Sequence, residues 1–237
     1  MASNSFFAVA VNIMTAPAEA FAAIKERPRI FLPLLLVICT IALSQYLYVQ
    51  QVDLGWLIEQ QIQASGQQIS DADRARTVEA VTRLPKAVYG GITAVSTAIV
   101  LPVVFAILAL YYTIVSFARG DGVKYKEWFS LLVHCALPTL LGVIATIVHL
   151  LVADARFMPQ NEINPLSFGS LLSIHPEKAT AVQTILLSLD PTSLWALALS
   201  VLGYQAFAKS SIVKAAAVVL GPLAVIVLVA SAIALLR

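Results

Sequence analysis

The sequence predicts an all-α protein that crosses a membrane several times, and three observations support this fold class. Hydrophobic residues make up 59% of the 237 residues and charged residues 12%, whereas soluble domains carry about 25% charged residues. The mean hydropathy of +0.87 indicates more apolar surface than a soluble core of this length could bury. Charged residues are also absent from five runs near the roughly 20 residues that a membrane helix needs. These runs are 30–52, 87–118, 128–153, 191–208 and 215–236.

The first 29 residues are expected to form a cytoplasmic segment that lies on the membrane surface. No positive charge precedes the apolar stretch 6–14, and Lys25, Arg27 and Arg29 follow it, which reverses the order in a secretory signal. A cleaved signal is the alternative, because residues 16–18 resemble a cleavage site. In an interfacial helix we expect the large apolar side chains to face lipid, namely Phe6, Phe7, Val11, Met14 and Phe21.

The first two spans are expected at 30–52 and 91–117. As a helix, the run 87–118 would be about 48 Å long at about 1.5 Å per residue, which exceeds the hydrocarbon core of about 30 Å. Gly90 and Gly91 therefore predict that the membrane part begins near Gly91 and that the preceding residues lie at the interface.

Two long segments, 53–90 and 154–190, are predicted to be outer, periplasmic loops that each contain a short amphipathic helix. In the first, residues 70–73 have the pattern of a helix N-terminus, and apolar residues recur at helical spacing until Pro85. In the second, apolar residues of 176–189 share one helical face. Asp190 and the following proline then predict the N-cap and first position of the fourth span, 191–208. A fifth span is expected at 215–236.

Prolines lie inside or near the start of four predicted spans. A proline in a membrane helix leaves a backbone carbonyl without its usual partner, so each one predicts a kink. Such kinks serve gating in some proteins, but prolines are common in membrane helices, so they can also simply shape a packed bundle. The four residues are Pro33, Pro102, Pro138 and Pro222.

The lysines and arginines predict that the N-terminus lies in the cytoplasm and the C-terminus outside. Eight of them fall in three short segments on the N-terminal side, whereas seven are spread over two long loops and the C-terminus. Positive charge in short loops orients membrane insertion. When acidic residues are included, the N-terminal side carries +4 and the other side −2. The predicted cytoplasmic face should therefore attract anionic lipid headgroups.

The segment 117–138, FARGDGVKYKEWFSLLVHCALP, combines charges, glycines, a histidine and a cysteine between two apolar runs. Its Gly-Asp-Gly element lacks the other glycines of a dinucleotide site and the Gly-Lys-Ser/Thr of a P-loop. It also does not follow a strand, so it predicts a tight turn built on Gly120 and Gly122. We expect Trp128 to anchor the returning helix at the membrane interface, and Pro138 to bend the third span.

His134 and Cys135 raise the question of a metal site, to which His149 or Cys39 could contribute. The two histidines would lie about 22 Å apart along a helix at about 1.5 Å per residue, so they cannot share an ion. The two cysteines with one histidine would leave a tetrahedral zinc ion short of a ligand. Packing or a hydrogen bond to a neighbouring helix is the simpler interpretation. We expect no metal, cofactor or catalytic residue, since no Gly-x-Ser-x-Gly, His-Glu-x-x-His or paired carboxylate occurs in a predicted span.

Three segments carry a family resemblance: TAPAEAFAAIKERPRIFLPLLL (15–36), FARGDGVKYKEWFSLLVHCALPTLL (117–141) and LDPTSLWALALSVLGYQAFAKSS (189–211). Together they resemble the bacterial branch of the Yip family, named after the Ypt-interacting-protein domain. The likeness covers nearly the whole chain and rests on the order of its elements rather than on one specific motif. The candidate functional positions are Pro17, Phe21, Pro28, Gly120, Trp128, His134, Pro138, Asp190, Trp195, Gly203 and Lys209.

The resemblance implies a single Yip-like domain over 1–237, with five membrane helices and a cytoplasmic N-terminus. Eukaryotic members are linked to Rab-type GTPases and vesicle trafficking, whereas bacterial members mostly lack an assigned role. This chain has neither their long N-terminal region nor their Asp-Leu-Tyr-Gly-Pro signature. GTPase binding is therefore not carried over to it.

The leading hypothesis is a non-enzymatic, multi-pass protein of the bacterial inner membrane that acts in membrane organisation. Its expected partners are anionic lipid headgroups and other membrane proteins or further copies of itself, and not nucleic acid. The alternative is a small transporter, channel or lipid translocase that uses the kinked helices. A proton-coupled carrier is disfavoured, because no Asp, Glu, Lys or Arg lies within a predicted span. A third hypothesis, an enzyme acting on lipids, would depend on Arg119, Asp121, Lys124 and Lys126.

Overall fold

The computed structural model describes residues 5–65, 69–174 and 181–235, and this part of the chain contains helices and no strand. The prediction of an all-α fold is therefore confirmed. The helices are α1 (Phe6–Thr15), α2 (Pro17–Glu26), α3 (Phe31–Gln51), α4 (Leu54–Ser65), α5 (Asp71–Thr82), α6 (Lys86–Arg119), α7 (Tyr125–Cys135), α8 (Thr139–Val152), α9 (Phe168–Leu171), α10 (Ala181–Ser188), α11 (Pro191–Ala208) and α12 (Ile212–Leu235).

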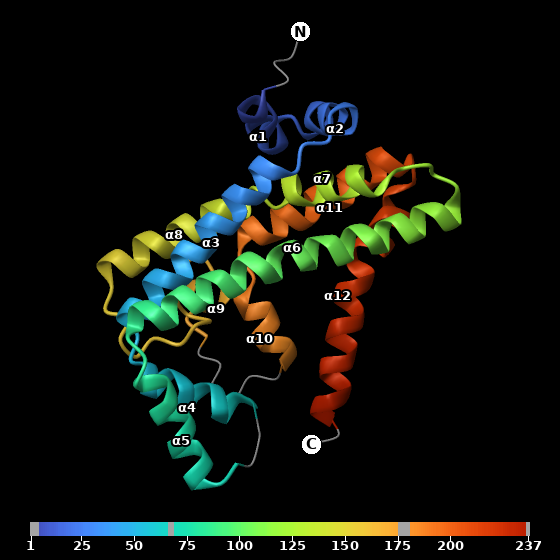
Figure 1. The fold of residues 1–237 in the computed structure, drawn as a ribbon. Coiled ribbons are helices and arrows are strands. Elements are labelled where there is room, and N and C mark those ends of the chain that lie inside the picture. Colours follow the sequence, from blue (N-terminus) through green and yellow to red (C-terminus); the bar gives the residue numbers. More distant parts are fainter. Residues whose placement is uncertain (1–4, 66–68, 175–180, 236–237) are drawn as a thin grey trace.

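A bundle of α3, α6, α7, α8 and α11 forms the centre of the molecule (Figure 1). Within it, α3 packs along α6, α7 lies against α6 and α11, and α8 lies against α3 and α11. α1 and α2 cover one end, where both contact α7 and α2 also contacts α11. α4 and α5 lie at the opposite end, and α12 extends away from the bundle after packing against α11 (Figure 1).

Several helices have the length and hydropathy of membrane spans. Within the described residues, α3, α6 and the part Ile212–Ala232 of α12 each meet this requirement, and α7 with α8 meets it as one span bent by 41°. α11 has 18 residues and is not among them, because polar residues such as Ser193 and Gln205 lower its hydropathy. The predicted fourth span, 191–208, the total of five spans and the orientation with the N-terminus inside therefore stay predictions.

Of the four span prolines, only Pro138 lies at a break. Pro33 occupies the first turn of α3, where a missing N–H breaks no helical hydrogen bond. The helix continues through Pro102 in α6 and Pro222 in α12. Pro138 separates α7 from α8, so the predicted bend of the third span is confirmed.

α6 is one helix of 34 residues that begins at Lys86, so the Gly90-Gly91 pair does not interrupt it. Gly90 instead allows a close approach to α3, because a Cβ atom there would lie 2.9 Å from Tyr46 Cδ2 and from Gln50 Nε2. Lys86 Nζ also donates a hydrogen bond of 2.7 Å to the carbonyl oxygen of Val52, just after α3. The glycine thus serves helix packing.

The N-terminal segment packs more deeply than the sequence predicted. It forms two helices, and Phe6 and Phe21 are 7% and 4% exposed, so the expectation that they face lipid is wrong. Their burial follows from a shared inward face, which also buries Ile13 and Ile24 against the bundle. Phe7, at 75%, is exposed as expected. The segment therefore completes the core at this end of the protein.

Trp128 also lies in the core, where none of its surface is exposed. The prediction that it anchors a helix at the membrane interface is therefore wrong. The physical reason is local: α7 passes between α6 and α11, and residues 128–135 are all buried. An aromatic residue beside a charged turn suits a core as well as a membrane interface, so the sequence alone did not decide between them.

The outer loops contain more helix than predicted. α5 begins at Asp71 with Ser70 as its N-cap, which confirms the first predicted loop helix. α4 was not predicted, although Leu54 and Leu57 bury one face of it in a second core beside Tyr48. α10 confirms part of the second loop helix, and residues 176–180 of that prediction lie outside the described residues.

Candidate functional site

The turn between α6 and α7 has the conformation that its glycines predicted. Gly120 and Gly122 have φ angles of 72° and 70°, in the left-handed region that glycine enters without steric cost. The backbone N–H of Lys124 then donates a 2.6 Å hydrogen bond to Glu127 Oε2, which caps the start of α7. Arg119 Nε lies 3.4 Å from Asp121 Oδ2 across the turn. The tight turn is confirmed.

An aromatic cluster next to this turn connects the helices at this end of the bundle. Trp128 stacks on Tyr204 with ring centroids 4.8 Å apart, and Tyr112 meets both rings edge-on at 5.5 and 5.3 Å. Phe207 lies 5.6 Å from Trp128. The Lys25 ammonium sits 5.3 Å from the Phe207 ring centroid and donates a 2.8 Å hydrogen bond to the Phe207 carbonyl oxygen. The cluster therefore joins α2, α6, α7 and α11.

Gly203 permits the closest contact in this region. A Cβ atom at this position would lie 2.6 Å from Leu131 Cδ1 and 3.1 Å from Phe21 Cε1. A larger residue in α11 would therefore push against both α7 and α2. The structure brings together two candidate positions, Phe21 and Gly203, and explains both by packing.

A cleft of about 510 Å³ lies beside this contact, and we call it the α2/α11 cleft. Its walls are mostly apolar, and Lys209 and Ser210 lie at the end of α11. Lys209 is the C-cap of α11 and has a φ angle of 48°. The Ser210 hydroxyl oxygen is buried and has no hydrogen-bond partner within the described residues. The walls are formed by Pro17, Ala18 and Phe21 of α2 and by Leu202, Gln205 and Ala206 of α11.

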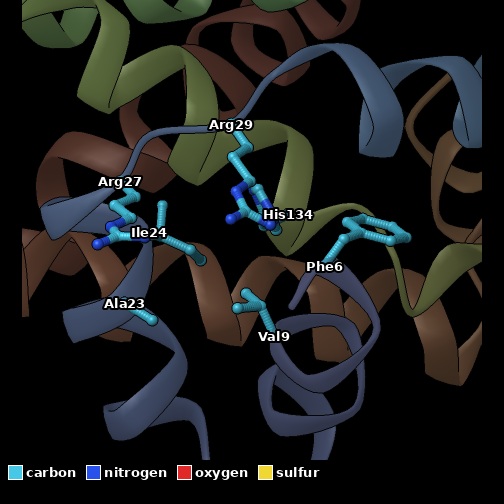
Figure 2. A pocket seen from close by; sticks show the side chains of 7 residues that line it. All are labelled: Phe6, Val9, Ala23, Ile24, Arg27, Arg29 and His134. Atoms are coloured by element: carbon cyan, nitrogen blue, oxygen red, sulfur yellow. The ribbon is translucent and has the colours of Figure 1, made fainter. Parts of the chain in front are cut away.

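His134 lines a smaller, enclosed cavity between α1, α2 and α7 (Figure 2). The side chain is 2% exposed, and its Nδ1 lies 2.7 Å from the Ser130 carbonyl oxygen. Because a carbonyl only accepts, Nδ1 carries the proton and donates. Arg27 and Arg29 line the same cavity. Its volume of about 10 Å³ leaves room for about one water molecule.

The candidate metal ligands do not come together at one site in the described part of the chain. His149 Nδ1 lies 3.0 Å from the Ile163 carbonyl oxygen in the second outer loop. Cys135 is buried, whereas Cys39 is exposed. Within the described part of the chain, no three His, Cys, Asp or Glu residues are grouped so that they could hold a metal ion.

Asp190 organises the junction of α8, α11 and the second outer loop. Its Oδ1 accepts a 2.7 Å hydrogen bond from the Ser193 backbone N–H, which confirms the predicted N-cap. Its Oδ2 accepts a 2.7 Å bond from Asn164 Nδ2. A Cβ atom at Gly142 of α8 would lie 2.8 Å from the same Oδ2. This position is therefore structural and lies far along α11 from the cleft.

The remaining candidate functional positions do not lie together at one site. Pro28 lies between α2 and α3, and Trp195 is 41% exposed on α11. Pro17, Phe21 and Lys209 are the candidate positions that meet around the cleft. Sequence reasoning missed Ser210, because nothing in the pattern of the α11–α12 connection indicates that its hydroxyl is buried.

These features define a helical membrane protein whose N-terminal helices are part of the bundle. The Yip1 domain family matches residues 11–233, and the chain therefore belongs to this family. The resemblance inferred from the sequence is confirmed. The chain is also 26% identical over 196 residues to a Bacillus subtilis (strain 168) protein named membrane protein YknW, which covers 81% of this chain and 75% of that relative. No solved structure matches the chain.

Proposed function

We propose that this Yip1-family protein is a non-enzymatic, multi-pass protein of the bacterial inner membrane that organises the membrane through lipid and protein contacts. One observation carries the proposal: the three basic segments gather at one end of the bundle. α2 and α7 both pack against α11, and Lys25 is bonded to the Phe207 carbonyl near the end of α11. The segments 19–29, 119–127 and 209–214 together hold eight basic and four acidic residues.

The charge at this basic end suits a surface of anionic headgroups. A Lys or Arg near such a surface contributes about 1 kcal/mol, and the attraction fades within a Debye length of about 8–10 Å. A net charge of +4 over three adjoining segments can therefore position the protein without any single strong contact. Exposed apolar side chains of α6, such as Ile99 and Ile107, would face the lipid chains.

Protein contacts are proposed on α12. This helix packs against α11 and α10, while Val225 and Leu228 are 59% and 68% exposed. Ala224 lies next to Val225 in this helix, and small residues permit a close approach of another helix. A second copy of the chain is one partner that such a face would accept.

The test uses the full chain in nanodiscs that contain zwitterionic and anionic phospholipids in equal amounts. Lipids that remain with the protein are identified by native mass spectrometry, and neighbours in the original membrane are captured by cross-linking. We expect enrichment of anionic lipid and a reproducible protein neighbour or dimer. A monomer without neighbours and without anionic enrichment would contradict the proposal.

A separate experiment tests the proposal that the protein is not an enzyme. The purified protein is incubated with phospholipid vesicles, and lipid products are measured by mass spectrometry. We expect no turnover. Lipid turnover that disappears when Arg119, Asp121, Lys124 and Lys126 are replaced by alanine would establish the enzyme hypothesis instead.

A lipid translocase or small transporter is the second candidate, and the bent α7–α8 pair favours it. Transport sites often use discontinuous helices, because an interrupted helix offers free backbone groups at membrane depth. Here α7 and α8 meet at 41° around Pro138. Liposomes that carry the protein should then show lipid scrambling or solute flux above empty vesicles. Equal rates with and without protein, at several pH values, would remove this candidate.

A further inference from the structure

We propose that the α2/α11 cleft binds one anionic phospholipid molecule, with its phosphate at Lys209 and Ser210 and an acyl chain along the apolar walls. This inference rests on the lipid contact of the proposed function and assigns it to a specific site. The electrostatic attraction described above would act on many headgroups, whereas this site would hold one.

The cleft has the size and lining that such a ligand needs. Its volume of about 510 Å³ lies within the range of about 300–1,000 Å³ of small-molecule sites. Phe21 on one wall and Leu202 on the other offer an apolar surface for a hydrocarbon chain. The cleft is open to the outside rather than enclosed, so a lipid can enter it without crossing the protein.

The polar end of the cleft consists of hydrogen-bond donors. Lys209 supplies an ammonium group, Gln205 an amide and Ser210 a hydroxyl group. The Ser210 oxygen is buried without a partner in the described chain, although buried hydroxyl groups normally make hydrogen bonds. A phosphate group accepts from all three donors, and the bond from an ammonium group is charge-assisted.

The backbone conformation of Lys209 supports a role for its side chain in binding the lipid phosphate. Its φ angle of 48° is a left-handed conformation at a helix C-cap, where glycine is the usual residue. A lysine here carries a steric cost that glycine avoids. A cation also suits the C-terminal end of the helix dipole, but a lysine in the last helical turn would serve that purpose without the steric cost.

The walls of the cleft are held at a defined spacing. Gly203 brings α11 against Phe21 of α2, and Lys25 bonds to the Phe207 carbonyl oxygen at 2.8 Å. A preformed site loses little conformational freedom when it binds a ligand. The choice of an anionic lipid follows from charge, because Lys209 lies within the basic end, which carries a net +4.

The experiment measures bound phosphatidylglycerol on the full chain, taken from nanodiscs of phosphatidylglycerol and phosphatidylcholine and delipidated stepwise in detergent. Two variants test the two halves of the site. Lys209→Gly removes the ammonium group and suits the left-handed backbone, so its Tm should be unchanged or higher. Ala206→Trp fills the apolar part. Matched controls are Lys214→Ala on α12 and Ala98→Trp on α6, which change exposed residues outside the cleft.

We expect the wild-type protein and both controls to retain one phosphatidylglycerol. Lys209→Gly should lower its retention at least about tenfold, which is the effect of losing one charge-assisted hydrogen bond. Ala206→Trp should abolish retention. A photoactivatable phosphatidylglycerol should label residues 198–211 in the wild-type protein and lose this labelling in both variants.

Three results would overturn the inference. If all variants retain the lipid equally, the bound lipid is only part of the surrounding bilayer, and the proposed function survives without this site. If the wild-type protein retains no lipid, the lipid contact of the proposed function fails as well. If cross-links place a second copy of the chain in the cleft, the site is a protein interface.

Discussion

Gly203 sets the distance between three helices because it has no side chain at their crossing. Leu131 of α7 and Phe21 of α2 occupy the space that a Cβ atom would need. Gly91 on α6 is a useful contrast, since no atom lies within 4 Å of a Cβ added there. These two helical glycines therefore have different physical roles.

The first prediction uses this contrast. Gly203→Val should lower the free energy of unfolding by about 1–3 kcal/mol, because overpacking forces neighbouring side chains from their preferred positions. Gly91→Val should change it by no more than about 0.5 kcal/mol. Thermal unfolding in a single detergent measures both. Equal shifts in Tm would show that the crossing at Gly203 is looser than described.

The second prediction concerns the aromatic cluster. Trp128→Ala removes a fully buried ring that stacks on Tyr204, and should destabilise the protein by about 3–5 kcal/mol. Trp195→Ala is the matched control, because Trp195 is 41% exposed, and a small effect is expected. Chemical unfolding monitored by the remaining tryptophan fluorescence provides the measurement. A larger loss from Trp195→Ala would contradict this description of the core.

At the level of residues, the sequence identified the special backbone positions better than the buried ones. Gly120, Gly122 and Asp190 were recognised because turns and N-caps have local requirements. Trp128 and Phe21 were misplaced because a large aromatic side chain suits both a membrane environment and a core. Only the packing of α2 and α7 against α11 distinguishes these two environments.

At the level of elements, the α6–α7 turn depends on two left-handed glycines rather than on packing. No atom lies within 4 Å of a Cβ added at Gly120 or Gly122, so a substitution there changes the backbone energy alone. The third prediction is that Gly120→Val destabilises the protein by about 1–3 kcal/mol. Gly120→Asn should have a smaller effect, because asparagine tolerates the left-handed region. Similar Tm values for both variants would argue against this conformation.

Helices were predicted more reliably than their boundaries and surroundings. Apolar runs indicated α3, α6 and α12 because a membrane helix must satisfy its own backbone hydrogen bonds. α4 was missed because its apolar face is short and packs against a small second core beside α3 and α5. The cleft was also beyond prediction from the sequence, since α2 and α11 are far apart in the chain. Their contact depends on tertiary packing.

At the scale of the whole molecule, the grouping of basic segments allows a direct test of orientation. The fourth prediction is that a cysteine in the first turn of α7 faces the cytoplasm and one on α5 faces the other side. Lys126→Cys and Arg76→Cys are made in a chain that carries Cys39→Ser. A membrane-impermeant thiol reagent should label Lys126→Cys only in inverted vesicles and Arg76→Cys only in intact spheroplasts. The reverse pattern would invert the proposed orientation.

The bond from Lys25 to the Phe207 carbonyl has a consequence for biogenesis. The two residues are 182 positions apart, and α1 and α2 leave the ribosome long before α11 does. At a synthesis rate of about 5–20 residues per second, α11 is made about 10–40 s after α2. During that interval Ile13, Phe21 and Ile24, which are buried in the finished fold, have only an incomplete bundle to pack against, because α11 is still missing. The bilayer surface, or a chaperone, would have to shelter these side chains until translation delivers α11.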